Sequence, residues 1–126
     1  GLSYHPDDVK RLVSACGKAN ASELLFGAQA WPAERGLSAG LVNQLICADS
    51  FQIETKQLVS AICANSRAAN RVLKQTIRSI DTNNASAIQD SEAAFDALFF
   101  SDDFIAGRDA FLNKTPVNFP SNKQTK

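Results

Sequence analysis

Signals that begin and end helices recur along almost the whole chain, and they restrict its fold more than any other feature. Pro6, Asp7 and Asp8 are typical of a first helical turn, because the missing N–H of proline is not needed there and acidic charges complement the helix dipole. Gly17 predicts that this helix ends at about Cys16. The same reasoning predicts further helices over residues 19–26, 32–38, 50–64, 66–80, 86–99 and 101–113.

Capping residues and one apolar stripe support the later helices. The expected side-chain caps are Asp49 or Ser50, Ser66, Ser86 and Ser101. Ser86 with Gln89 three residues later matches a capping box. The helix that follows Ser66 carries a regular apolar face with a period of about 3.6 residues. This face consists of Ala69, Val72, Leu73, Thr76, Ile77 and Ile80.

A single short segment has the character of a strand. Leu41–Ile46 is too short for a helix and fits an extended conformation. We therefore predict an all-α fold, a helical region with at most one short extended segment. Residues 1–113 are expected to form the helical region, and the polar residues 114–126 are expected to be a flexible tail.

Five phenylalanines crowd the last two predicted helices within 17 positions: Phe95, Phe99, Phe100, Phe104 and Phe111. Each ring left in water forfeits about 1.5–3 kcal/mol of burial. The rings therefore predict either a tight internal core, which is the usual outcome, or a surface that a partner covers. The chain begins with Gly1 and contains no Met, so we expect a processed, excised or recombinant piece of a longer polypeptide, which favours the partner.

Net charge and cysteine content indicate which classes of partner and which cellular compartment to expect. The 13 basic and 13 acidic side chains cancel, so neither nucleic acid nor a membrane surface is favoured as a partner. No apolar run approaches the length of a membrane span, and no signal peptide opens the chain. Cys16, Cys47 and Cys63 are odd in number and widely spaced, which argues against a disulfide framework or a zinc site. We expect buried, reduced thiols in a cytoplasmic protein.

No cluster of residues predicts a self-contained active site or a metal site. His5, the only histidine, stands at a helix start, where capping is its expected role. The pairs Asp7-Asp8 and Asp102-Asp103 each lie in a first helical turn, where their charge is explained by the helix dipole. The remaining carboxylates considered are isolated on polar helix faces: Glu23, Glu34, Glu54 and Glu92.

Four basic residues follow one face of the helix predicted over 66–80: Arg67, Arg71, Lys74 and Arg78. They lie at positions i, i+4, i+7 and i+11, opposite the apolar face. Such a stripe is more often a solvated surface, and a phosphate or nucleic-acid site is the alternative.

Two stretches carry denser patterns. Residues 21–46 look like A-x-E-L-L-x-x-G, then a Pro- or Ser-Ala start and then G-L-V-N, with matches at Ala21, Glu23, Leu24, Leu25, Ala33, Gly40, Leu41, Val42 and Asn43. Residues 101–119 follow S-x-D-x-x-x-G-x-x-A-F-L-x-K with a later Phe, through Ser101, Asp103, Gly107, Ala110, Phe111, Leu112, Lys114 and Phe119. In this order and at this separation, the two stretches resemble the crotonase (enoyl-CoA hydratase/isomerase) family over nearly the whole chain.

The resemblance implies the helical C-terminal portion of a fold whose N-terminal part is a spiral core of ββα repeats. Family members act on acyl-CoA thioesters by hydration, isomerisation, decarboxylation or hydrolysis, and they form trimers that often pair into hexamers. The oxyanion hole and the acid/base residues come from the spiral core, so no catalytic residue is implied in this chain. Coenzyme A enters as the substrate's thioester, and no separate cofactor is implied.

Phe111 and Lys114 are the CoA-contacting residues that the resemblance implies. An aromatic face suits the adenine and an ammonium group suits the phosphates, commonly across a subunit boundary. For Phe111, packing in an apolar core is an equal alternative, because the residue also lies on the apolar stripe of its helix.

Three features depart from the family pattern. Thr115 and Pro116 follow Lys114, where the family usually has basic residues. Arg35-Gly36 replaces an acidic residue followed by Ala. Leu2–Asp8 lacks the Gly-Gly-Thr run of many hydratases and is more similar to decarboxylase-like or atypical members, so the reaction type stays open.

Two functions of different classes follow from the sequence. The first is the C-terminal part of an enoyl-CoA hydratase/isomerase-family protein that contributes trimer contacts and part of the CoA site. The alternative is a non-catalytic helical interaction or scaffold domain with no role in CoA binding. A standalone enzyme is the least favoured, since the sequence shows neither an oxyanion hole nor an activated nucleophile.

Overall fold

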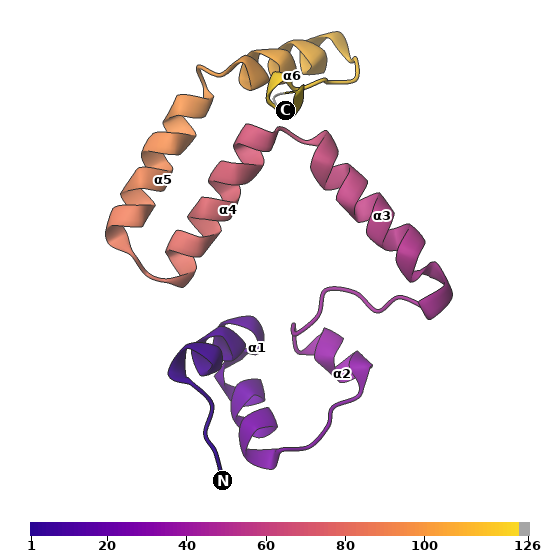
Figure 1. Cartoon of the computed structure of the whole chain (residues 1–126), viewed down its shortest axis with the longest axis vertical. Helices are drawn as coiled ribbons and strands as arrows, with labels where there is room; N and C mark the ends of the chain where they lie inside the picture. Colours follow the sequence, from indigo (N-terminus) through magenta and orange to yellow (C-terminus); the bar gives the residue numbers. More distant parts are fainter. Residues whose placement is uncertain (124–126) are drawn as a thin grey trace. The chain divides into compact units, whose positions relative to one another are not determined.

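The computed structural model describes residues Gly1–Lys123, and these residues form helices and loops without a strand (Figure 1). The chain divides into two compact units, unit 1 over Gly1–Phe51 and unit 2 from Gln52 onwards. The elements are α1 Pro6–Gly27, α2 Ala33–Ser38, α3 Ala48–Ala64, α4 Arg67–Asp81, α5 Ala85–Leu98, α6 Asp102–Asn113 and the 3₁₀ turn η1 Pro120–Lys123. The predicted all-α class is confirmed.

In unit 1, α1 consists of two helical segments joined at a break. Gly17 has φ 77° and ψ 162°, a conformation that lies outside the helical region and that glycine adopts without steric strain. The predicted end of the first helix at Cys16 is therefore correct. The second segment ends at Gly27, and Ala28 follows it in the left-handed conformation with φ 49°.

Side-chain contacts in unit 1 link α1 to α2. Arg35 Nη2 on α2 lies 2.5 Å from Glu23 Oε2 on α1, and the Arg35 guanidinium lies 4.0 Å from the centre of the Trp31 ring. Glu23 is thus paired, and the prediction that it is isolated is wrong. The partner stands 12 positions away, beyond the reach of local sequence pattern.

Gly40 allows the end of α2 to approach α1 closely. Its φ is 83°, and a Cβ atom at this position would lie 3.0 Å from the carbonyl oxygen of Ala15. Both the backbone conformation and the contact therefore require glycine. This explains the glycine of the G-L-V-N pattern physically.

The strand prediction for Leu41–Ile46 is wrong, because this segment forms an irregular connection between α2 and α3. A strand needs a partner whose backbone groups complete its hydrogen bonds. No other segment within residues 1–123 is extended into a strand that would serve as that partner.

In unit 2 the predicted caps are half right. Ser66 accepts a hydrogen bond from Ala69 N at 3.0 Å, and Ser101 accepts one from Phe104 N at 3.2 Å, so both cap as expected. Helix α5 instead begins after Asn84, which accepts from Ala87 N at 3.1 Å, and the capping box at Ser86 is wrong.

Helix α3 also begins earlier than predicted, at Ala48. Asp49 consequently lies in its first turn, and neither Asp49 nor Ser50 is its cap.

Small buried serines fill the contact between α4 and α5, which lie side by side in Figure 1. Ser79 on α4 donates to the carbonyl oxygen of Ala87 at 3.1 Å, and its Oγ lies 3.4 Å from the Oγ of Ser91 on α5. Both serines are buried. The hairpin is therefore joined by a polar contact between small side chains.

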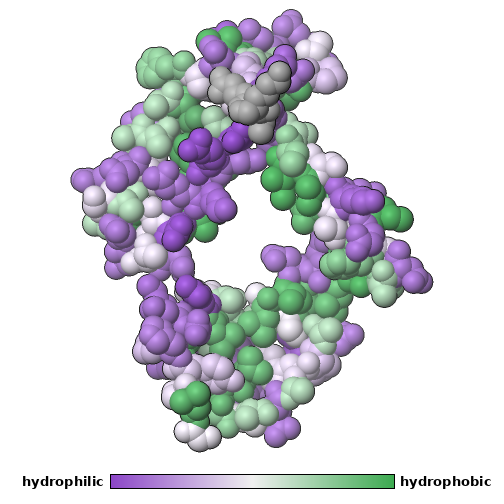
Figure 2. Space-filling view, in the orientation of Figure 1, coloured by the Kyte–Doolittle hydropathy of each residue, from purple (hydrophilic) through white to green (hydrophobic). Residues whose placement is uncertain are grey.

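Very little apolar side chain is buried in the described residues. Only Cys16 and Ala21 count as buried hydrophobics, and no large side chain is fully buried. All five phenylalanines of the predicted cluster lie between 42% and 88% exposed. Figure 2 shows hydrophobic residues at the surface of both units. The expectation of a tight internal core is therefore wrong for residues 1–123.

The apolar faces of α3 and α4 are open as well. On α3 the exposed residues are Phe51, Ile53, Leu58, Val59 and Ile62, and on α4 they are Leu73, Ile77 and Ile80. None of the described helices is both long and apolar enough to cross a bilayer.

The three cysteines are free thiols. Cys16 is buried as predicted, whereas Cys47 and Cys63 are exposed, so the prediction of three buried thiols is wrong. Cys47 precedes α3 and Cys63 lies in the last turn of α3, a helix whose apolar residues are themselves uncovered.

Part of the predicted tail is structured. The turn η1 places the Asn122 amide against the end of α3, where it donates to the carbonyl oxygens of Cys63 and Asn65 at 3.1 Å each. Residues 124–126 lie outside the described residues, and the flexibility of the tail as a whole stays a prediction.

Candidate functional site

An apolar groove of about 740 Å³ lies between α4, α5 and α6 of unit 2. We call it the phenylalanine groove, because four aromatic rings lie along it together with Leu73 and Leu98: Phe95, Phe99, Phe104 and Phe111, with Phe119 at one side. Phe99 meets Phe95 edge-on at a centroid distance of 5.2 Å and Phe104 at 5.3 Å. These contacts give the groove a fixed aromatic wall.

Phe119 reaches the groove because Gly107 has no side chain. A Cβ atom on Gly107 would lie 3.4 Å from Cε1 of the Phe119 ring, which therefore rests directly on the backbone of α6. The glycine and the terminal phenylalanine of the closing motif are thus in contact with each other.

Asp103 fixes the position of α6 from inside unit 2. Its side chain is only 5% exposed, and its carboxylate accepts hydrogen bonds from Ser66 Oγ, from Ser121 Oγ and, at 2.9 Å, from Ser121 N. This set, which we call the Asp103 cluster, joins the starts of α6 and α4 to η1. The starts of α4 and α6, whose Ser66 and Asp103 line the groove, are thereby held together through η1.

Burial raises the pKa of the Asp103 carboxyl, but the hydrogen bonds from Ser121 and Ser66 outweigh it and hold the pKa below its ordinary value. Asp103 is therefore a carboxylate at neutral pH, and its charge is balanced by donors. The helix dipole alone does not explain why the charge of Asp103 is placed here. The prediction that gave Asp102 and Asp103 the same explanation is therefore incomplete.

The structure places Phe111 in the groove and at the surface. Its side chain is 83% exposed, so core packing does not account for it in the described residues. Its ring is free to make a further contact on the face turned to solvent.

Lys114 ends α6 in the left-handed conformation, with φ 52° and ψ 41°. Its backbone N–H donates to the carbonyl oxygens of Ala110 and Phe111, and its side chain is exposed. Lys114 does not line the groove, and no carboxylate within residues 1–123 forms an ion pair with it. The structure thus keeps both predicted residues accessible near the end of the same helix.

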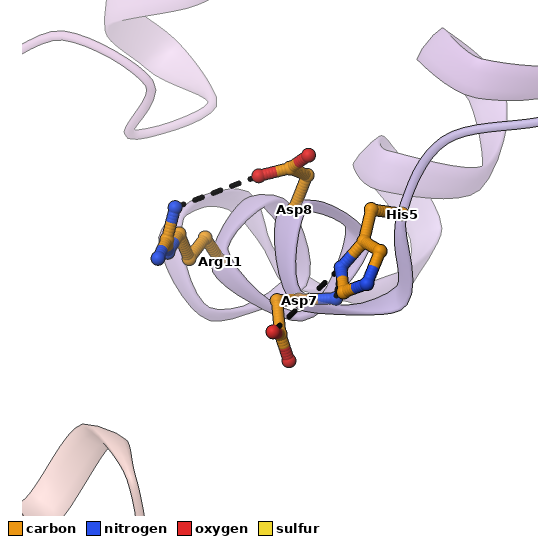
Figure 3. Close-up of polar contacts among 4 residues, drawn as sticks. All are labelled: His5, Asp7, Asp8 and Arg11. Carbon is orange, nitrogen blue, oxygen red and sulfur yellow. Dashed lines mark hydrogen bonds and ion pairs between the residues drawn. The ribbon is translucent and has the colours of Figure 1, made fainter.

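His5 caps α1, as predicted. Its Nδ1 accepts a hydrogen bond from Asp7 N at 3.3 Å and lies 3.6 Å from the Asp7 carboxylate (Figure 3). Asp8 pairs with Arg11 at 3.5 Å on the same turn. All four side chains are exposed, and their arrangement is that of a helix start.

The part of the chain that the structure describes holds no group of three or more His, Cys, Asp or Glu that is placed to bind a metal ion.

The comparisons with known proteins agree on one family. The family model for enoyl-CoA hydratase/isomerase matches residues 7–122. The chain belongs to this family. The predicted crotonase resemblance is confirmed.

Curated relatives cover most of this chain. The probable enoyl-CoA hydratase echA8 of Mycobacterium leprae (strain TN) is 31% identical over 111 residues, 87% of this chain and 43% of the relative. Methylmalonyl-CoA decarboxylase of Escherichia coli (strain K12) is 26% identical over 122 residues, 94% of this chain and 47% of the relative. The chain therefore spans less than half the length of these two relatives.

Solved structures give the same picture. A crystal structure assigned to an enoyl-CoA hydratase/isomerase family protein from Hyphomonas neptunium matches with a TM-score of 0.85 and 28% identity, over 96% of this chain and 46% of that one. An enoyl-CoA hydratase from Bacillus anthracis matches with a TM-score of 0.80 at 21% identity, over 90% of this chain and 44% of that one, which shows the shared fold.

The closing motif behaves as one structural unit. Ser101 caps α6, Asp103 anchors it, Gly107 receives the Phe119 ring, and Phe111 lines the groove. Sequence reasoning identified these positions from the resemblance but did not find the groove or the Asp103 cluster. The only local signal for the cluster was the Asp of the motif itself, since its partners Ser66 and Ser121 are 37 and 18 positions away.

Proposed function

We propose that this chain is the C-terminal helical part of an acyl-CoA-processing enzyme of the enoyl-CoA hydratase/isomerase family, and that it contributes subunit contacts and part of the CoA site. The observation that carries the proposal is the apolar surface of α3 to α6, which is left open while, among residues 1–123, only Cys16 and Ala21 are buried hydrophobics. Surfaces of this kind mark an interface with another protein segment. The chain's span of less than half of its relatives supports a missing partner segment.

In this proposal the covering partners are a spiral core of the family type and further copies of the chain, assembled as a trimer or a hexamer. Backbone N–H groups of the core would polarise the thioester carbonyl, and the present chain would supply no acid or base. The substrate is an acyl-CoA thioester. A cytoplasmic role in fatty acid metabolism, as a hydratase, isomerase or lyase, fits the relatives, which include both hydratases and a decarboxylase.

For the CoA contact we propose Phe111 and Lys114. The exposed Phe111 ring offers a face on which an adenine can stack, and Lys114 carries a positive charge about one helical turn away. A left-handed residue at the end of α6 turns the chain sharply, and this exposes the Lys114 side chain beyond the last helical turn.

A chimera tests the proposal, with the spiral-core segment of a full-length family member placed before Gly1. We expect assembly into a trimer or hexamer by analytical ultracentrifugation, and turnover of crotonyl-CoA or methylmalonyl-CoA that the 126-residue chain alone does not show. A compact monomeric 126-residue chain, together with a chimera that neither assembles nor binds CoA, would instead support the scaffold alternative.

The CoA contact is tested in the same chimera. Phe111→Ala is expected to weaken CoA binding about tenfold, because stacking of a base on an aromatic ring contributes about 1–3 kcal/mol. Phe100→Ala is the matched control, since Phe100 is 88% exposed and does not line the groove. Equal effects of the two substitutions on the dissociation constant of CoA would contradict the assignment of Phe111.

A further inference from the structure

The basic stripe of α4 borders a second depression that the proposed CoA contact does not use. This depression, of about 390 Å³, lies between the end of α3, the first half of α4 and η1. Arg67, Arg71 and Lys74 line it, and no acidic residue in the described part of the chain does. We call it the basic groove.

Charge is concentrated at this place in an otherwise neutral chain. Helix α4 carries four of the chain's 13 basic residues and a single acidic one, Asp81 at its far end. Arg71 and Lys74 form no ion pair with any carboxylate that the structure describes. Arg71 and Lys74 therefore lie beside a concavity without an ion-pair partner among the described residues, and such cations attract an anion.

The floor of the basic groove is held in place by side-chain amides. Asn70 donates to the carbonyl oxygen of Ile62 at 3.0 Å, and Asn122 donates to those of Cys63 and Asn65. Asn122 Oδ1 also accepts from Arg67 N at 3.0 Å. These bonds fix α3, α4 and η1 around the groove, so its shape does not depend on a ligand.

The cations of the groove lie away from the exposed apolar residues of α4, whereas Ile62 of the apolar face of α3 lines the groove. The basic residues lie opposite the apolar face formed by Leu73, Ile77 and Ile80. If the apolar face is covered as proposed, the cations remain available to solvent.

We propose that the basic groove binds a compact phosphate anion that carries two or more negative charges, such as a diphosphate or a phosphate monoester. The Arg71 guanidinium and the Lys74 ammonium group match the charge and the hydrogen-bonding capacity of such an anion. The volume admits a small anion, and the three cations span only two helical turns of α4. This inference does not depend on the proposed CoA contact at α6.

The test uses the full chain labelled with ¹⁵N and titrated with sodium pyrophosphate, followed by NMR. We expect shifts that concentrate in backbone amides 65–74 and in the side-chain amides of Asn70 and Asn122. The binding should weaken when NaCl approaches about 1 M, where the Debye length falls to about 3 Å. Shifts that are absent, or spread over the basic residues of the whole chain, overturn the proposal.

Variants sharpen the test. Arg71→Gln and Lys74→Gln are each expected to weaken pyrophosphate binding about tenfold, as the loss of one charge-assisted contact does. Arg78→Gln is the matched control, because Arg78 lies on the same stripe but not in the groove, and it should change the affinity less than about twofold. Equal losses in all three variants overturn the proposal, and they would indicate the extended stripe that a nucleic acid uses. Should a variant fail to fold, the shift map of the unsubstituted chain decides.

The source of the phosphate is resolved by comparing CoA, dephospho-CoA and free pyrophosphate as probes. A preference for CoA over dephospho-CoA that Lys74→Gln removes assigns the groove to a terminal phosphate monoester. Equal binding of pyrophosphate and CoA assigns it to a diphosphate. Phe111→Ala should leave pyrophosphate binding unchanged, so failure of the CoA contact and failure of the basic groove are distinguishable.

Discussion

The two units are stabilised by opposite kinds of buried residue. In unit 1 the buried side chains are the small and apolar Cys16 and Ala21, whereas in unit 2 they are polar: Ser66, Ser79, Ser91 and Asp103. Unit 2 thus places hydrogen-bonding groups inside and phenylalanines outside. A unit with this distribution obtains its internal order from specific polar contacts and leaves its hydrophobic surface for an interface.

The sharpest test of this contrast is Asp103→Asn. The substitution removes a buried charge that accepts three hydrogen bonds, and bonds to charged groups contribute about 1.5–3 kcal/mol each. We expect the free energy of unfolding of unit 2 to fall by about 3 kcal/mol, measured by urea denaturation. Asp102→Asn, in the same helical turn but exposed, should change it by less than about 0.5 kcal/mol. Similar losses for both would mean that unit 2 is not held by its polar interior.

The pH dependence follows from the same residue. Because the pKa of Asp103 is lower in the folded chain than its ordinary value, the unfolded chain binds the proton first as the pH falls. The contribution of Asp103 is complete above about pH 4 and is lost as the pH falls through the depressed pKa. Acid titration of the unfolding free energy should show this loss for the unsubstituted chain and a smaller one for Asp103→Asn.

In unit 1 the expected sensitivity lies in the backbone. Gly40→Ala places a methyl group 3.0 Å from the Ala15 carbonyl oxygen at a φ of 83°, which should destabilise the unit by about 1–3 kcal/mol. Gly36→Ala is the internal control, because Gly36 lies within helix α2 and the atom nearest to an added Cβ is 4.0 Å away. We expect the free energy of unfolding to rise by up to about 1 kcal/mol. Thermal unfolding monitored by circular dichroism should therefore shift in opposite directions for the two alanines.

The smallest effect concerns the exposed rings of unit 2. Phe111→Ala should change the unfolding free energy by less than about 0.5 kcal/mol, since its ring is mostly in solvent. Phe99→Ala should lower the free energy of unfolding by about 1–2 kcal/mol, because that ring is 48% exposed and packs against two other rings. Urea denaturation measures both. A large loss for Phe111→Ala would assign this ring to the interior of unit 2.

Sequence reasoning succeeded where the cause is local. Gly17, Ser66 and Ser101 act through their immediate neighbours, and each was predicted from propensity and capping alone. The same reasoning failed at Ser86, because Asn84 stands two residues earlier and is an equally good cap. The strand at Leu41–Ile46 failed because pairing depends on a second segment that no local pattern shows.

The candidate site was predictable only in part. The resemblance identified Phe111 and Lys114, and the closing motif includes Asp103 but not Asp102 without indicating that the Asp103 side chain is buried. In the Asp103 cluster, Ser66 precedes Asp103 by 37 positions and Ser121 follows it by 18, and only the fold brings the three residues together. The sequence also did not predict how much aromatic surface is exposed. An apolar stripe indicates that a helix face is covered, but it does not identify the segment or partner that covers it.

The hydrogen bonds from Ser121 to Asp103 determine the order in which parts of the chain fold during translation. Asp103 obtains two of its three hydrogen bonds from a residue that is translated 18 codons after it, so the Asp103 cluster closes only once η1 has left the exit tunnel. Unit 1 uses contacts within its first 51 residues and is able to form while translation continues. During that interval the apolar faces of α3 to α5 are exposed without this anchor.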